Sequence, residues 1–237
     1  EIERTKNNMG AISLRSVEKT YGHGAKAVKV IHGVSAEIPD GEFIVIVGPS
    51  GCGKSTLFNI VAGLEEPDAG GSIQFLGKPC RASDLLGKVS FMPQRDLLLP
   101  WRTVIDNAIL AVELEGARRS DARRMALDML PEFGLAGFES QYPHELSGGM
   151  RQRVLIAIAI ALRPALIIAD EPTSALDVTV QKQVLALLQR LQRERGLSYL
   201  LITHDVDVIA AMAHEVVVMK DGALLEQGSV DRVLQHP

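Results

Sequence analysis

Residues 43–56 read FIVIVGPSGCGKST, and this stretch decides the fold. Its first five residues, Phe43 to Val47, form an unbroken apolar and largely β-branched run, which is typical of a strand buried on both faces of a parallel sheet. A glycine-rich loop follows directly, and a helical pattern begins near Lys54 and ends around Gly63. A strand, a glycine-rich loop and a helix in immediate succession predict a unit of an α/β fold.

The loop has the spacing G-x-x-x-x-G-K-[ST] of a phosphate-binding loop, or P-loop. Glycines let successive backbone N–H groups turn inward around an anion, and the helix that follows points its N-terminus at the phosphates. In this pattern Lys54 contacts the β- and γ-phosphates, and the Ser55 hydroxyl is placed to ligate Mg²⁺. The expected nucleotide-binding residues are therefore Gly48, Pro49, Ser50, Gly51, Cys52, Gly53, Lys54, Ser55 and Thr56.

Two later apolar runs repeat the pattern of a buried strand with polar residues at its end. Leu166 to Ala169 is followed by Asp170 and Glu171, and Leu200 to Ile202 is followed closely by His204. In a P-loop fold the first carboxylate holds Mg²⁺, and the next residue can polarise a water for in-line attack. The other interpretation is structural, with an acidic pair that caps a helix and a histidine that caps a helix or packs in the core.

The middle of the chain differs in character from both ends. Ser120 to Leu130 is charged and amphipathic, and Met150 to Leu162 is nearly all apolar. These patterns predict a helical insertion within an α/β core. We expect one domain over residues 1–237. Residues 1–94 and 164–237 would form its core, and residues 95–163 would form the helical insertion.

Composition and charge exclude several classes of protein. A formal net charge of -4 and a pI near 5.9 give no global attraction to nucleic acid or anionic lipid. The longest apolar run, Val154 to Leu162, is far shorter than the roughly 20 residues of a spanning helix, and residues 1–9 do not resemble a signal peptide. Cys52 and Cys80 lack a disulfide framework and metal-ligand spacing, which favours a reducing compartment.

A second anion-binding pattern distinguishes between P-loop families. Residues 146–153 read LSGGMRQR at the start of an apolar helix. The Ser147 hydroxyl, the N–H groups of Gly148 and Gly149 and the helix N-terminus together favour an anion. One chain rarely needs two such sites for one triphosphate. We therefore expect Ser147 to Gly149 to contact a nucleotide held by another copy.

Residues 146–150 resemble the LSGGQ signature of ABC ATPases, with Met150 where glutamine is commoner. Other elements of that family follow in order, and the resemblance extends from about Ile12 to Gln235. It implies a P-loop NTPase (RecA-like) α/β core with an antiparallel β subdomain and an inserted α-helical subdomain. The further matching positions are Tyr21 for the A-loop aromatic that stacks on adenine, Gln94 for the Q-loop, Ser174 to Asp177 for the D-loop and His204 for the switch histidine.

The resemblance implies an ATPase with ATP and Mg²⁺ as cofactors. Two subunits, identical or similar, would close head-to-tail, with each ATP between one P-loop and the other subunit's Ser147, Gly148 and Gly149. Glu171 would be the general base or water-orienting carboxylate, and His204 would stabilise the transition state. The Mg²⁺ environment would come from Ser55, Gln94 and Asp170.

Because no spanning segment is present, the resemblance implies separate transmembrane permease subunits and a solute-binding protein, with this chain peripheral at the cytoplasmic face of the inner membrane. The expected function is to energise solute import by a bacterial ABC transporter. Leu97 to Val104 resembles ATPases of nitrate, sulfonate and taurine importers, whereas Tyr142 to Gln181 resembles dipeptide-importer ATPases. The solute is therefore not specified. Pro100 and Trp101 would either face the permease's coupling helix or pack against the helical insertion.

Three other functions stay open at this point: export, lipid handling, and a soluble non-transport role on nucleic acid or ribosomes. Proteins of the last class usually carry two cassettes in one chain or a long coiled-coil insertion, and neither pattern is present. A P-loop kinase would have no need of the Ser-Gly-Gly helix. The sequence after the core is too short for the long C-terminal regulatory domain of sugar-importer ATPases, so we expect no such feedback site.

Overall fold

A six-stranded sheet forms the centre of the computed structural model, which describes residues 11–94 and 97–235. Its strand order is β10-β9-β3-β8-β7-β6, with every neighbouring pair parallel except β9 and β10. The strands are β3 (Phe43–Val47), β6 (Val89–Met92), β7 (Leu166–Asp170), β8 (Ser198–Ile202), β9 (Glu215–Lys220) and β10 (Ala223–Ser229). The predicted parallel α/β core is confirmed, and residues 1–9 lie outside the described part.

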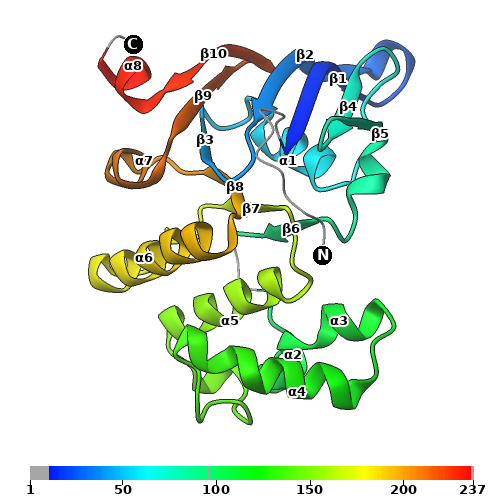
Figure 1. Cartoon of the computed structure of the whole chain (residues 1–237). Coiled ribbons are helices and arrows are strands. Elements are labelled where there is room, and N and C mark those ends of the chain that lie inside the picture. Colours follow the sequence, from blue (N-terminus) through cyan, green and yellow to red (C-terminus); the bar gives the residue numbers. More distant parts are fainter. Residues whose placement is uncertain (1–10, 95–96, 236–237) are drawn as a thin grey trace.

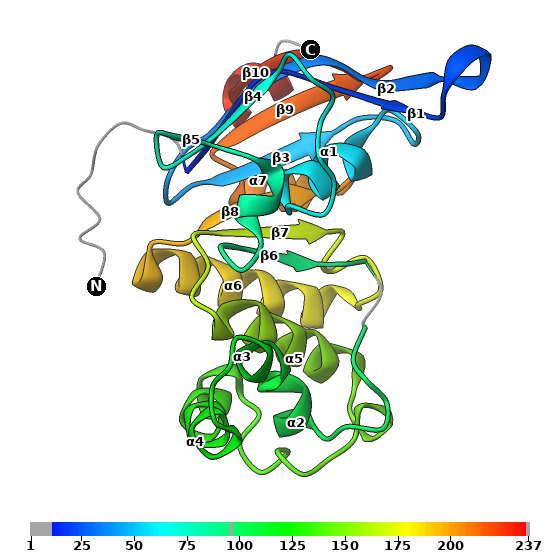
Figure 2. The ribbon, with the colours of Figure 1, turned by 90° about the vertical axis from the view of Figure 1, so that its right-hand side faces the viewer.

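A second sheet is antiparallel and four-stranded, with the order β2-β1-β4-β5. Its strands are β1 (Ile12–Tyr21), β2 (Val28–Ile38), β4 (Ser72–Phe75) and β5 (Lys78–Cys80). This sheet lies at one end of the molecule, and the helical region lies at the other (Figures 1 and 2). The antiparallel β subdomain and the inserted helices are thus both present.

The helices divide between the two parts of the fold. Those of the core are α1 (Lys54–Val61), α6 (Val178–Arg195), α7 (Val206–Met212) and α8 (Val230–Gln235). Those of the helical region are α2 (Val104–Ala108), α3 (Leu110–Leu114), α4 (Arg119–Met129) and α5 (Gly148–Ala161). Short 3-10 turns occur at Gly24–Lys26, Ala82–Leu85, Leu130–Phe133 and Pro143–Glu145. In the described part of the chain, no helix combines the length and hydrophobicity needed to cross a membrane.

Strand β3 shows why the six-stranded sheet is apolar on both faces. Phe43 and Val45 belong to the core that packs against the helical region and α6, whereas Ile44 and Ile46 belong to the core that contains α1 and the four-stranded sheet. Alternate residues of a strand point to opposite faces, so an unbroken apolar run is required. The sheet is therefore held between two cores, and the carboxyl ends of its parallel strands are left to form a site.

Candidate functional site

The loop between β3 and α1 has a shape that only glycine accepts at two positions. Gly53, which caps α1, has φ +100°, and a Cβ there would lie 2.8 Å from the Ile31 side chain and 3.0 Å from the Val30 carbonyl. A Cβ on Gly48 would lie 2.2 Å from the carbonyl oxygen of Met219. Both approaches are far shorter than real contacts. Strands β2 and β9 therefore fix the shape of the loop.

Lys54 extends its ammonium group back over this loop. Its Nζ donates to the carbonyl oxygens of Gly48 at 2.8 Å and Pro49 at 2.9 Å. These bonds hold a positive charge at the mouth of the loop and at the first turn of α1, whose backbone N–H groups also attract an anion. The Lys54 ammonium and the N-terminus of α1 therefore both attract an anion to the phosphate loop.

A pocket of about 540 Å³ opens at the carboxyl ends of β3, β6, β7 and β8. Most of the residues that line it are ones that the sequence predicts to bind nucleotide or Mg²⁺ or to act in hydrolysis. The lining consists of Val30, Ser50, Gly51, Gly53, Lys54, Ser55, Thr56, Gln94, Asp170, Glu171 and Ile202. A pocket of this size, formed by backbone N–H groups, an ammonium, hydroxyls and two carboxylates, suits a polyphosphate with a cation.

Three residues of the predicted loop set do not line the pocket: Gly48, Pro49 and Cys52. The Cys52 side chain is 3% exposed and packs in the core that contains α1. Its N–H donates to the Pro49 carbonyl at 3.3 Å. The Cys52 Sγ accepts from the Lys54 ammonium, which lines the pocket, at 3.7 Å. The thiol is thus buried beside a pocket residue without lining the pocket itself, and contact between Cys52 and nucleotide stays a prediction.

Asp170 and Glu171 leave β7 in different environments. Burial raises the pKa of the Asp170 carboxyl, the negative charge of Glu171 raises it further, and Lys54 acts in the opposite direction. Glu171 has φ +46°, a strained left-handed conformation for a residue with a side chain. Its N–H donates to the Ile202 carbonyl at 2.9 Å, and its carbonyl accepts from the Ser174 hydroxyl at 3.1 Å. Hydrogen bonds to Ile202 and Ser174 therefore hold Glu171 in this strained conformation.

The Glu171 carboxylate, at the end of β7, is bonded to residues that follow the two neighbouring strands, β6 and β8. Gln94, just after β6, donates from Nε2 to Oε2 at 2.9 Å, and His204, just after β8, places Nδ1 2.8 Å from Oε1. Gln94 was expected near Mg²⁺. Its amide nitrogen is instead used on Glu171, which leaves the amide oxygen available for a cation.

Tyr21, at the end of β1, lies beside Thr56 but outside the pocket lining. Its hydroxyl donates to Glu65, and Lys19 lies 5.4 Å from the ring centroid. Burial and the hydrogen bond to Glu65 raise the pKa of Tyr21, while Thr56 acts in the opposite direction. The side chain is 40% exposed, so a ring face remains free to stack on a planar ligand. No motif in the sequence points to this role of Glu65.

The Ser-Gly-Gly segment lies apart from this pocket, in the helical region (Figure 1). Ser147 caps α5, since its hydroxyl accepts from the Met150 N–H at 3.3 Å, and Ser147 and Gly148 are exposed. Gly149 is buried, and a Cβ there would lie 2.4 Å from Cγ1 of Val180. Gly149 is therefore required where α5 crosses α6, a role that sequence reasoning missed.

Trp101 is 71% exposed and Leu97 is 69% exposed. The alternative in which Trp101 packs against the helical insertion is therefore wrong, and an apolar side chain is left on the surface of the helical region.

Comparisons with known proteins agree with this geometry. A family model described as ABC transporter matches residues 31–174. The chain is 39% identical to the methionine import ATP-binding protein MetN 1 of Pseudomonas fluorescens in an alignment 233 residues long that covers 95% of this chain and 69% of that protein. Neither match names nitrate, sulfonate or taurine, so that part of the prediction is not confirmed.

Two solved structures have the same fold. One is a dimer of the ATP-binding cassette MJ0796 bound to ADP and Pi, with a TM-score of 0.80 and 32% identity over 92% of this chain and 98% of that one. The other is cbiO1 from Clostridium perfringens, part of the ABC transporter complex cbiONQ, with a TM-score of 0.86 and 26% identity over 97% of this chain and 92% of that one.

Proposed function

The chain belongs to the ABC transporter family as an ATP-binding, ATP-hydrolysing cassette, and we propose that it energises solute import by a bacterial ABC importer. The MetN relative is named as an import protein, which supports the direction of transport. Helices α2 to α5 all fall within residues 95–163, which supports the predicted division into a core and a helical signature subdomain.

One observation carries the proposal: the chain holds two anion-binding elements that do not meet. Lys54 and Ser55 line the pocket, whereas Ser147 is exposed at the start of α5 and does not line it. Two copies arranged head-to-tail would bring the pocket of one against Ser147 to Gly149 of the other. We propose this dimer, with ATP between the subunits, as the state that hydrolyses ATP.

In this scheme Glu171 orients the attacking water and accepts its proton. Gln94 and His204 bond to separate oxygens of the carboxylate, so its orientation is restrained before substrate arrives. The His204 side chain is 79% exposed and is bonded to Glu171, a residue that lines the pocket. We propose that His204 stabilises the charge that develops on the γ-phosphate in the transition state.

The residues around Asp170 fit a Mg²⁺ ion. Asp170, the Ser55 hydroxyl and the Gln94 amide oxygen offer hard oxygen donors at one side of the pocket, and Asp170 is a half-buried carboxylate next to a second negative charge. In the described part of the chain, no group of three or more His, Cys, Asp or Glu side chains is placed to hold a metal. Nucleotide phosphates would therefore complete the coordination, as Mg²⁺ commonly requires. Bound there, the ion neutralises phosphate charge during transfer.

We propose that the exposed surface around Leu97 and Trp101 contacts a separate permease subunit, which places the chain peripherally at the cytoplasmic face of the membrane. A solute-binding protein would complete the importer. Residues 97–104 resemble ATPases of nitrate, sulfonate and taurine importers, and residues 142–181 resemble those of dipeptide importers. The MetN relative is named for methionine. What these solutes share is that they are small and polar, and this is the class of solute that we propose.

Purification of the intact complex tests this function. The chain should be recovered with membrane-spanning chains, and in vesicles containing the complex solute should cross the membrane towards the side of this subunit when ATP is supplied on that side. Recovery without membrane chains, or ATP-driven movement of solute away from the side of this subunit, would replace import with one of the other functions.

A further inference from the structure

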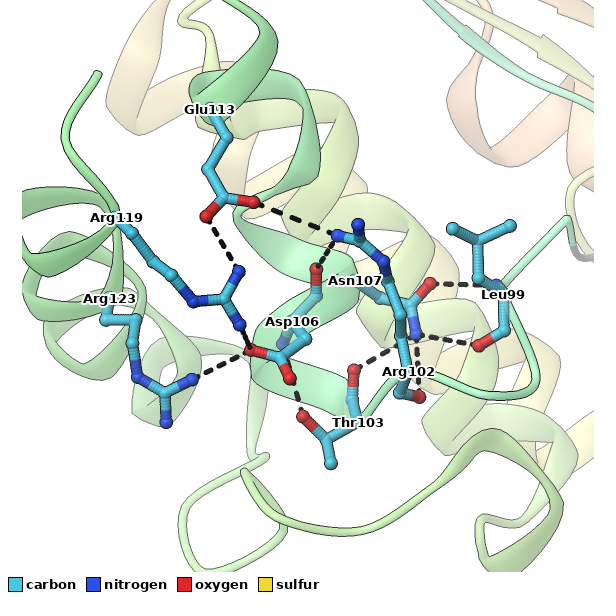
Figure 3. Close-up of polar contacts among 8 residues, drawn as sticks. All are labelled: Leu99, Arg102, Thr103, Asp106, Asn107, Glu113, Arg119 and Arg123. Atoms are coloured by element: carbon cyan, nitrogen blue, oxygen red, sulfur yellow. Dashed lines mark hydrogen bonds and ion pairs between the residues drawn. The ribbon is translucent and has the colours of Figure 1, made fainter. Parts of the chain in front are cut away.

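The turn that carries Trp101 is built around the buried side chain of Asn107 in α2. Asn107 is 3% exposed, in contrast to Trp101. The Arg102 N–H donates to the Leu99 carbonyl at 3.0 Å and closes a turn with Pro100 and Trp101 at its tip. Figure 3 shows the Asn107 amide directed at the backbone of this turn.

The Asn107 amide bonds to Leu99 as one peptide group bonds to another. Its Oδ1 accepts from the Leu99 N–H at 2.8 Å, and its Nδ2 lies 3.2 Å from the Leu99 carbonyl oxygen. The same Nδ2 lies 3.0 Å from the carbonyl oxygens of Arg102 and Thr103. Only an amide side chain of this length both donates and accepts in this geometry. Because the Asn107 side chain is buried, leaving its amide unpaired is costly.

Charged neighbours make further contacts on the outer side of α2. Arg102 donates to the Asp106 carbonyl at 3.3 Å, and the Asp106 carboxylate pairs with Arg119 and Arg123 of α4 at 2.8 Å each (Figure 3). The Arg119 side chain is 54% exposed and that of Arg123 44%. Ion pairs so exposed contribute little stability. The buried bonds of Asn107 therefore decide the conformation of the turn.

We propose that Asn107 is a positioning residue, which holds the Pro100–Trp101 turn in the one pose that the membrane partner meets. The naming of a permease as that partner rests on the proposed function. The physical gain is preorganisation. A turn that is already fixed loses less conformational entropy on binding than a mobile one, so it binds more tightly and more selectively.

Trp101 is the one tryptophan in the sequence, so intrinsic fluorescence reports the pose of the turn directly. Asn107→Asp keeps the shape and the acceptor of the side chain but loses both N–H donors and sets a carboxylate against three carbonyls. We expect the nanosecond component of Trp101 depolarisation to grow at least about two-fold, with circular dichroism unchanged. Equal depolarisation in Asn107→Asp and the parent chain would overturn the proposal.

Arg123→Ala is the matched control. It removes an ion pair from the outer side of α2 and leaves every bond of Asn107 in place, so Trp101 depolarisation should equal that of the parent. If Asn107→Asp fails to fold, hydrogen exchange on the unaltered chain decides. The Leu99 amide should exchange at least about ten-fold more slowly than an unprotected peptide, and unprotected exchange would overturn the proposal.

The partner is tested in the complex purified with its own membrane chains. Asn107→Asp should reduce the amount of this chain retained on those membrane chains at least about three-fold relative to Arg123→Ala. Retention equal to the control, despite increased Trp101 motion, would overturn the link between the pose and the partner. If the parent chain itself is recovered without membrane chains, the proposed function fails instead, and the fluorescence of the isolated chain still tests the positioning role.

Discussion

His204 Nδ1 lies 2.8 Å from Glu171 Oε1, so residues that follow two neighbouring strands, β8 and β7, are bonded directly to each other. Gln94, which follows β6 on the other side of β7, bonds to the second carboxylate oxygen. Because β6, β7 and β8 are neighbours in the sheet, the residues that follow β6 and β8 both restrain the carboxylate that follows β7. That carboxylate also sits on strained backbone, a feature concentrated at functional sites.

Glu171→Gln should preserve ATP binding and slow hydrolysis by about 10²- to 10⁴-fold, because the amide keeps the shape of the side chain but cannot accept a proton. The variant should also accumulate as a dimer when ATP is present, which size-exclusion chromatography would detect. Glu194→Gln is the control, since Glu194 is exposed on α6 and pairs with Arg190 at 3.9 Å. Hydrolysis by Glu171→Gln at the rate of that control would remove Glu171 from the role of base.

Asp170→Asn should make the nucleotide-free chain more stable at neutral pH while it abolishes Mg²⁺-dependent hydrolysis. Burial raises the pKa of the Asp170 carboxyl above its ordinary 3.8, so the folded chain holds this proton more tightly than the unfolded chain. The group therefore favours folding at low pH and opposes it as the pH rises through the raised pKa. Asparagine, which has no charge, avoids that loss.

Thermal unfolding without nucleotide or Mg²⁺ checks this prediction. The unfolding midpoint of Asp170→Asn should exceed that of the parent at neutral pH, and the difference should shrink as the pH falls through the raised pKa towards the ordinary value of 3.8. A variant that is less stable than the parent at every pH would show that the carboxylate is favourable in the empty site.

Glu65→Ala should weaken ATP binding about five-fold, the equivalent of roughly 1 kcal/mol for one partly exposed hydrogen bond. Glu65 accepts from the Tyr21 hydroxyl and from Asn59 at 2.8 Å, so it fixes the ring that we expect to stack on adenine. Tripolyphosphate provides the matched ligand, because it has the phosphates of ATP but no base. Calorimetry should show its affinity unchanged, and an equal loss for both ligands would mean that Glu65 supports the phosphate loop rather than Tyr21.

Much of the core and the pocket could be predicted because the relevant signals are local. Phe43 to Val47 is apolar at every position, which requires burial on both faces, and the glycine spacing after it specifies a phosphate loop over a few residues. Asp170 and His204 could be placed at the same edge because parallel strands end together. In these cases a short stretch of sequence is enough to predict the local structure and its place in the sheet.

The features that escaped prediction depend on contacts between distant segments or on the direction of one side chain. Cys52 lies in the phosphate loop, yet its side chain is buried and does not line the pocket, whereas Ser50 and Gly51 do. Asn107 looks like an ordinary helix residue until its bonds to Leu99 are seen. No periodicity encodes such directions, because they follow from how the loop folds back on its own helix.

Gly149 shows the same limit and yields the last prediction. The sequence assigned it to an anion site, but a Cβ at this position would lie 2.4 Å from Cγ1 of Val180 on α6. Alanine usually favours a helix over glycine, so Gly149→Ala should stabilise α5 if the helix stood alone. Because α6 leaves no room, we expect the substitution to lower the free energy of unfolding by about 1–3 kcal/mol.

A double-mutant cycle separates packing from anion binding at this position. Val180→Ala removes the methyl groups that Gly149→Ala would strike, so the penalty of the glycine substitution should shrink or reverse in that background. Gly148→Ala is the matched control, because its Cβ would lie 3.5 Å from the Leu176 side chain, an ordinary contact. If chemical denaturation gives the same penalty for Gly149→Ala with and without Val180, the helices do not meet at this glycine. A penalty that Val180→Ala removes would instead show that contact with Val180 of α6 is what requires a glycine at position 149 of α5.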